Sequence, residues 1–136
     1  MPRYIAIIDY DQEEGKFGAV FPDAPGCAAM GESEEEVIDN ATDALAEWAA
    51  DWVADGRSLP VPRSYGELLK VGDDAIGPGG LIATVPLILE TGKVARANVS
   101  MDAGLLTSID EAARRQGVTR SAFISAAARD RIKLAG

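Results

Sequence analysis

The side chains of this sequence that could do chemistry are carboxylates, because histidine is absent. The chain of 136 residues contains 22 aspartates and glutamates, one cysteine and no histidine. The commonest general base and metal ligand is therefore missing. A lone cysteine cannot form a zinc site, and without histidine it lacks its usual activating partner. We expect Cys27 to be a small, partly buried hydrophobic residue rather than a nucleophile.

Three aspartates near the first predicted strands, Asp9, Asp11 and Asp23, could bind divalent cations for phosphodiester hydrolysis. Such a nuclease needs several carboxylates that converge from rigid elements on two ions about 4 Å apart. Two of these three aspartates lie in or beside predicted turns, where the aspartate side chain commonly accepts hydrogen bonds from nearby backbone amides. A structural role is the favoured interpretation, a residual metal-dependent nuclease is the alternative, and we expect no cofactor and no bound metal.

A second set of carboxylates repeats every four residues along a predicted helix. Ser33 and Glu36 form a capping-box pattern at its start, and Gly56 is a plausible end. The acidic positions are Asp39, Asp43, Glu47, Asp51 and Asp55, on the side opposite Trp48 and Trp52. Like charges at this spacing destabilise a helix by about 0.2–0.5 kcal/mol per pair. Two interpretations stay open, a solvated face that aids solubility and a docking stripe for a basic partner protein.

Charge divides the chain into two parts of opposite sign. Residues 93–136 hold eight basic and four acidic side chains, a net charge of +4. Residues 1–92 hold five basic and eighteen acidic side chains, a net charge of −13, within a whole-chain charge of −9. Two segments of opposite charge suggest two partners of opposite charge. We expect two domains, 1–92 and 93–136, with the boundary at Glu90–Lys93.

The first segment predicts a small α+β layer in the order strand, strand, strand, helix, strand. The expected strands are Arg3–Ile8, Lys16–Phe21, Cys27–Met30 and Leu81–Leu89. Pro86 demotes the last strand to an edge or a bulge. Ser64 and Glu67 predict a short capped turn, and Val71–Gly80 an exposed connector. The sequence shows no secretory signal and no membrane-spanning stretch, so we expect a cytoplasmic protein without a membrane partner.

The second segment predicts a strand followed by two helices. Polar residues Arg96, Asn98 and Ser100 alternate with small apolar ones from Ala95 to Met101. Asp102 can cap a first helix that ends at Gly117, and Thr119 can cap a second one. A segment of about 40 residues rarely buries a core alone, and the strand has an unpaired edge. We therefore expect a homodimer.

Two antiparallel copies of the Arg96–Met101 strand would form a ribbon that fits the DNA major groove. Arg96, Asn98 and Ser100 would then face base edges, since arginine suits guanine and asparagine suits adenine. The backbone amides near Arg120 and Ser121, at the start of the last helix, would meet a phosphate. The alternative is a dimerisation module that binds no DNA.

Both parts of the chain carry a family resemblance. In the N-terminal half the motifs are Tyr4-Ile5-Ala6-Ile7, Phe21-Pro22-Asp23-Ala24-Pro25-Gly26-Cys27 with Gly31, Glu34-Glu35-Glu36, Asn40-Ala41 and Ala44-Leu45. This half resembles the HicB antitoxin family. The C-terminal motifs are Arg96-Ala97-Asn98-Val99-Ser100-Met101 and Gly117-Val118-Thr119-Arg120-Ser121. They resemble a ribbon-helix-helix domain, and only Pro62–Gly80 lies outside both resemblances.

The resemblance implies a degraded ribonuclease-H-like N-terminal fold without catalytic residues that blocks a HicA-type toxin, an mRNA-cleaving protein. It further implies that the complex represses its own operon by binding operator DNA, as a ribbon-helix-helix homodimer or a higher oligomer. Asp39, Asp43, Glu47 and Asp51 are then expected toxin contacts. Two other classes stay open: the residual nuclease, and a dimeric transcription factor whose N-terminal domain senses a small ligand. A short, basic, histidine-containing protein encoded beside this chain would favour the antitoxin.

Overall fold

The protein divides into two compact units in its computed structural model, which describes residues 1–72 and 80–134. The first unit comprises residues 1–91, and the second begins at Gly92 and continues to the end of the described residues. Among the described residues, no helix is both long and apolar enough to cross a membrane.

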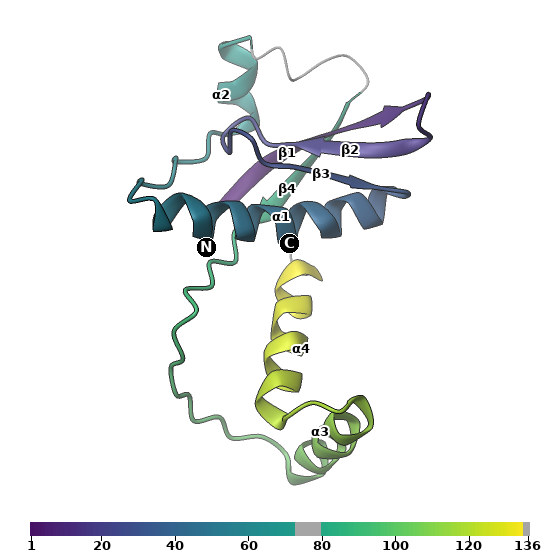
Figure 1. The fold of residues 1–136 in the computed structure, drawn as a ribbon, viewed down its shortest axis with the longest axis vertical. Helices are drawn as coiled ribbons and strands as arrows, with labels where there is room; N and C mark the ends of the chain where they lie inside the picture. The colour runs from purple at the N-terminus through teal and green to yellow at the C-terminus, as the bar shows by residue number, and fades with distance from the viewer. Residues whose placement is uncertain (73–79, 135–136) are drawn as a thin grey trace. The chain divides into compact units, whose positions relative to one another are not determined.

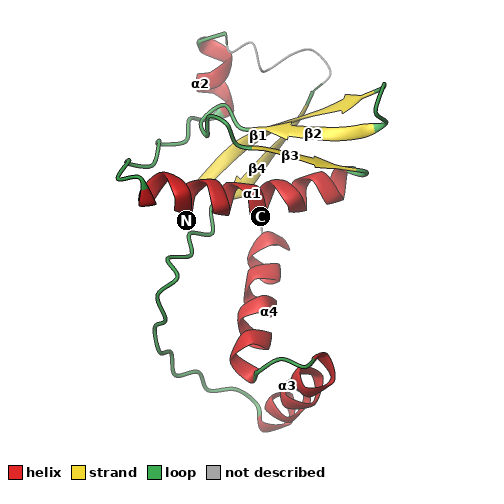
Figure 2. Cartoon of the chain, viewed as in Figure 1, coloured by secondary structure: helices red, strands yellow, loops and turns green. Residues whose placement is uncertain are grey.

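The first unit is built on a four-stranded antiparallel sheet (Figures 1 and 2). Its strands are β1 (Arg3–Asp11), β2 (Lys16–Val20), β3 (Ala28–Gly31) and β4 (Leu81–Pro86), in the order β3-β2-β1-β4. β4 therefore forms an edge, as Pro86 predicted, but it ends at this proline rather than at the predicted Leu89, because proline cannot donate a ladder hydrogen bond. The predicted α+β class with a βββαβ backbone is confirmed, and one further helix lies before β4.

Successive residues of β1 face opposite sides of the sheet. Tyr4, Ala6 and Ile8 are buried in the main core, whereas Ile5 and Ile7 are buried on the other side. β1 continues past the predicted end at Ile8 because it forms a ladder with β2 as far as the pair Asp11–Lys16. Asp9 therefore lies within a strand.

Helix α1 (Glu34–Ala54) covers one side of the sheet. Its first turn is fixed by Ser33, whose Oγ accepts a hydrogen bond from the Glu36 amide at 3.0 Å. The side chains that pack on the sheet recur every four residues and are fully buried: Val37, Ala41, Leu45 and Ala49. The helix ends before Gly56, whose φ of 79° is left-handed and favours glycine. The predicted helix is confirmed.

Helix α2 (Tyr65–Lys70) packs on the other side of the sheet. Ser64 and Glu67 form a complete capping box. The segment predicted as a short capped turn is therefore the start of a short helix. α2 buries one side chain, Leu68, against Ile5 and Ile7. The predicted connector Val71–Gly80 lies mostly outside the described residues. Because α2 is short, much of this side of the sheet is left for other contacts.

The second unit consists of an extended segment followed by helices α3 (Ala103–Gln116) and α4 (Arg120–Leu134). The predicted caps are confirmed: Asp102 Oδ1 accepts from the amides of Gly104 and Leu105, and Thr119 Oγ1 accepts from the Ala122 amide. Gly117 ends α3 at a φ of 69°. Within the described part of this unit, only Ala113 is buried.

In the single chain helix α4 buries no side chain. Ala122, Ala126 and Ala127 are exposed, while Phe123 and Ile124 are half-buried. The physical reason is that two short helices offer each other too little surface to cover a whole apolar face.

Candidate functional site

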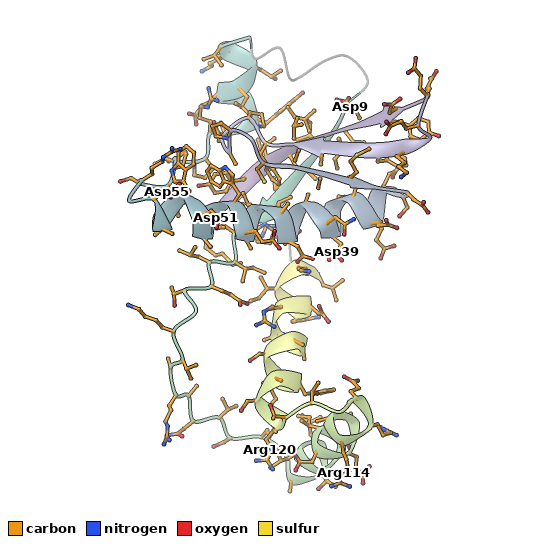
Figure 3. All side chains as sticks on the ribbon, in the orientation of Figure 1. Asp9, Asp39, Asp51, Asp55, Arg114 and Arg120 are labelled. Atoms are coloured by element: carbon orange, nitrogen blue, oxygen red, sulfur yellow. The ribbon has the colours of Figure 1, made fainter. Side chains whose placement is uncertain are left out.

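The acidic stripe lies along the solvent-exposed side of α1. All five predicted positions are exposed, and Figure 3 shows Asp39, Asp51 and Asp55 spread along this helix. Asp55 occupies the C-cap, and the last turn of α1 contains no basic residue. A carboxylate near a helix C-terminus interacts unfavourably with the helix dipole, at about 0.3–1 kcal/mol. Local helix stability therefore does not explain why Asp51 and Asp55 stand there.

The three aspartates of the nuclease alternative have separate surroundings. Asp11 Oδ1 accepts from the backbone amides of Glu13 and Glu14, at 2.9 and 3.3 Å, and so shapes the β1–β2 turn. Asp23 binds Arg63, and Asp9 is exposed on β1. Among the described residues, no group of three or more His, Cys, Asp or Glu could hold a metal ion. The hydrogen bonds of Asp11 with its turn and the ion pair of Asp23 with Arg63 agree with a structural role for both residues.

The ion pair between Asp23 and Arg63 was not predicted. One Asp23 oxygen accepts from the Arg63 backbone amide at 2.7 Å, and the other accepts from Nε at 2.7 Å. The Asp23 side chain is 9% exposed, so its charge is largely removed from water and needs this partner. No local pattern could have revealed the pair, because 40 residues separate its members.

Polar side chains also fix the loop between α1 and α2. The ring nitrogen of Trp52 donates to the Ser58 carbonyl at 2.9 Å, and the Tyr4 hydroxyl donates to the Pro60 carbonyl at 2.5 Å. Burial, and to a lesser extent the charge of Asp23, raise the pKa of Tyr4, so its hydroxyl stays protonated and remains a donor. These contacts hold the loop between α1 and α2 against the rest of the first unit.

Four of the five predicted DNA-binding residues line one hollow in the second unit. The hollow has a volume of about 700 Å³ and lies between the segment 95–101 and α4, and its lining includes Asn98, Ser100, Arg120 and Ser121. Arg96 is exposed in the same segment. Val99, expected on the apolar side of a strand, is 70% exposed. In the single chain residues 94–100 lie in no strand, so the paired ribbon stays a prediction for two copies.

The side chain of Arg120 is engaged within the unit. Its Nε and Nη2 donate to the two carboxylate oxygens of Asp110, both at 2.8 Å, and so link the start of α4 to α3. This hydrogen-bonded pair lowers the pKa of Asp110 and raises that of Arg120. A phosphate at the start of α4 would therefore meet backbone amides rather than this guanidinium.

Similar proteins share this architecture. The family model described as the HicB-like antitoxin of bacterial toxin–antitoxin systems matches residues 4–128. The crystal structure of antitoxin HicB from Burkholderia pseudomallei is 26% identical, with a TM-score of 0.56 over 94% of this chain and 96% of that chain. The crystal structure of antitoxin HicB3 is 28% identical, with a TM-score of 0.52 over 96% and 97%.

A third similar structure is a complex of HicA3 and HicB3, toxin and antitoxin. The matched chain is 26% identical, with a TM-score of 0.50 over 63% of this chain and 98% of that chain. A comparison with curated proteins found no match. The family model nevertheless spans most of both units, including the segment that carries Arg96 and Asn98. This chain belongs to the family of HicB-like antitoxins of bacterial toxin–antitoxin systems.

Proposed function

We propose that this chain neutralises a HicA-type toxin, an mRNA-cleaving protein, through its first unit and represses its own operon through its second. One observation carries the proposal: the change of net charge, from −13 to +4, falls where the chain divides into two units. A basic, RNA-binding toxin suits the negative unit, and DNA suits the positive one. The similarity to a HicB3 chain solved with a HicA3 toxin supports the first partner.

In this proposal the first unit is a reduced ribonuclease-H-like layer that acts without catalysis. The antiparallel strands β1, β2 and β3 followed by α1 support the layer. The contacts of Asp11 with its turn and of Asp23 with Arg63 support a role in structure rather than in hydrolysis. The antitoxin thus acts by covering its partner.

The proposal predicts that the acidic side of α1 accelerates the encounter with the toxin. In this proposal the ligand is a short, basic HicA-type protein, expected to be encoded beside this chain, and full-length antitoxin should rescue growth when the two are co-expressed. Glu47→Gln combined with Asp51→Asn should slow association about fivefold at low salt and have little effect at high salt, because complementary charges steer encounter. Stopped-flow association rates measure this.

The matched control removes the same two charges elsewhere. Glu111→Gln combined with Asp130→Asn changes net charge equally but leaves α1 intact. Equal slowing by both double variants would mean that overall charge, not the stripe, matters. Failure of the unaltered chain to rescue growth would overturn the toxin partner itself.

The second unit is proposed to be a ribbon-helix-helix dimer that reads operator DNA. Among the described residues of the unit only Ala113 is buried, and Val99 is exposed, so the unit gains a core and a paired strand when the 95–101 segments of two copies pair with each other. Arg96, Asn98 and Ser100 alternate with the apolar residues, so in the paired ribbon they share the face that enters the major groove. Backbone amides at Arg120 and Ser121 hold a phosphate.

Arg96→Ala and Asn98→Ala should each cost about 1–3 kcal/mol of binding to the operator and relax base preference. Dimerisation should survive, because both side chains are exposed. The control Arg115→Ala removes a charge at the end of α3 and should weaken operator and scrambled DNA alike. Fluorescence anisotropy at several salt concentrations separates these results. Equal losses on both DNAs for Arg96→Ala and Asn98→Ala would exclude base reading by this segment.

A further inference from the structure

One side of the sheet is open over β2 and β3. α1 covers the opposite side, and α2 covers this side only around Leu68 over β1 and its neighbour β4. Strand register places Ile7 beside Val20, and Val20 beside Ala28. Val20 is 43% exposed and Met30 is 50% exposed, although both stand in strands of a well-packed sheet. The result is an apolar surface over which the described residues place no helix.

This surface is hollowed at its centre. Ile7, Gly18, Val20, Ala28 and Met30 line a depression of about 440 Å³. Gly18 is part of this lining, and a Cβ atom built there would have nothing within 4 Å. The depression is large enough for a side chain from a partner, and apolar depressions of this kind bind anchor residues at protein interfaces.

Acidic residues border the depression on one side. Asp9 pairs in register with Gly18 and lines the depression, and Figure 3 shows it on β1, away from the stripe of α1. The hairpin that follows adds Asp11, Glu13 and Glu14 against one base, Lys16. An occupant must therefore be apolar at its centre and positively charged at its border.

Net charge distinguishes between the two proteins that could cover this surface, a second copy of the unit and a basic partner. A second copy of this unit would bring a net charge of −13 against the same charge, which opposes association. A basic protein would be attracted by the acidic border and could bury its own apolar side chains on the apolar surface. Interface centres are apolar and poor in charged residues, and methionine is enriched in them. The charged side of α1 lacks such a centre, whereas the open side of the sheet has one.

We propose that the basic toxin docks on the open side of the sheet, with an apolar side chain over Gly18 and a lysine or arginine against Asp9. This inference rests on the proposed function, for which it specifies the contact surface. The stripe on α1 then governs how fast the partners meet, and the sheet surface governs how long they stay together.

The test measures toxin dissociation from full-length variants by surface plasmon resonance, with a catalytically inactivated form of the toxin encoded beside this chain. Met30→Glu places a charge on the apolar surface, and Gly18→Ile places a side chain in the depression, where a Cβ atom meets nothing within 4 Å. Each should weaken binding by about tenfold or more, chiefly by faster dissociation. Asp9→Lys should weaken toxin binding, most strongly at low salt, where charge repulsion is least screened. The control Leu69→Glu alters a residue of α2 with 52% exposure and should change affinity less than about twofold.

Thermal unfolding of each variant shows whether the fold is intact, and Gly18→Ile keeps the test valid if Met30→Glu unfolds. Unchanged affinity of folded Met30→Glu and Gly18→Ile, with normal binding by the unaltered chain, would overturn the docking surface and leave the toxin partner standing. Absence of binding by the unaltered chain would instead overturn the proposed function. Loss of self-association with unchanged toxin affinity would assign the surface to a second copy.

Discussion

A chain that ends at residue 92 is expected to lose operator binding entirely while it keeps its fold and neutralises the toxin. Of the described residues, every buried hydrophobic one except Ala113 belongs to the first unit, so the truncation removes little of the core. It does remove the net +4 segment and leaves a net charge of −13, which phosphate repels. Gel-shift binding to the operator, thermal unfolding and growth rescue measure the three properties.

A dimerising fusion controls for avidity. Residues 1–92 joined to an unrelated dimeric coiled coil should rescue growth as well as the full chain, yet should not bind operator DNA. Rescue that returns only with the coiled coil would show that neutralisation needs two linked copies. Operator binding by residues 1–92 alone would contradict the proposed division of labour between the units.

Gly31→Ala is expected to lower the free energy of unfolding by about 3 kcal/mol and Tm by about 10 °C. A Cβ atom at Gly31 would lie 2.5 Å from the Val37 backbone nitrogen and 2.8 Å from the Val37 Cα. Neither atom can rotate away, so the start of α1 would have to move off β3. Urea unfolding followed by the fluorescence of Trp48 and Trp52 measures the loss.

Gly18→Ala is the matched control because Gly18 also lies in a strand of the same sheet. A Cβ atom at Gly18 meets nothing within 4 Å. An alanine there reduces the conformational entropy of the unfolded chain and should stabilise the protein by about 0.5–1 kcal/mol. Opposite signs for the two variants are the expected result. A stable Gly31→Ala variant would mean that α1 does not need its close approach to β3.

Local patterns in the sequence predicted most of the elements. Ser33, Asp102 and Gly117 were found from sequence alone because a cap acts on amides or carbonyls within a few residues. At α2 the cap formed by Ser64 and Glu67 was recognised, but a helix of six residues was not expected, and it forms because Leu68 gains a buried site on the sheet. That gain depends on tertiary packing, which the local pattern does not contain.

Contacts between distant residues could not be predicted in the same way. Arg63 pairs with Asp23 across 40 positions, and nothing near either residue identifies the other. The open side of the sheet was missed for a related reason. Alternation in β1 shows that both sides carry apolar residues, but how far a short helix covers one side depends on the path of the chain. The acidic side of α1, by contrast, was predictable because its position follows from helical periodicity alone.

The buried thiol of Cys27 can report how often the core of the first unit opens. Its side chain is buried in the core between the sheet and α1, and burial raises the pKa of the thiol to about 11. At neutral pH only on the order of one molecule in 10,000 would then hold the reactive thiolate while folded. Thiol reagents therefore modify Cys27 chiefly while α1 is transiently separated from the sheet. The labelling rate, with and without a bound partner, reports how often the antitoxin opens.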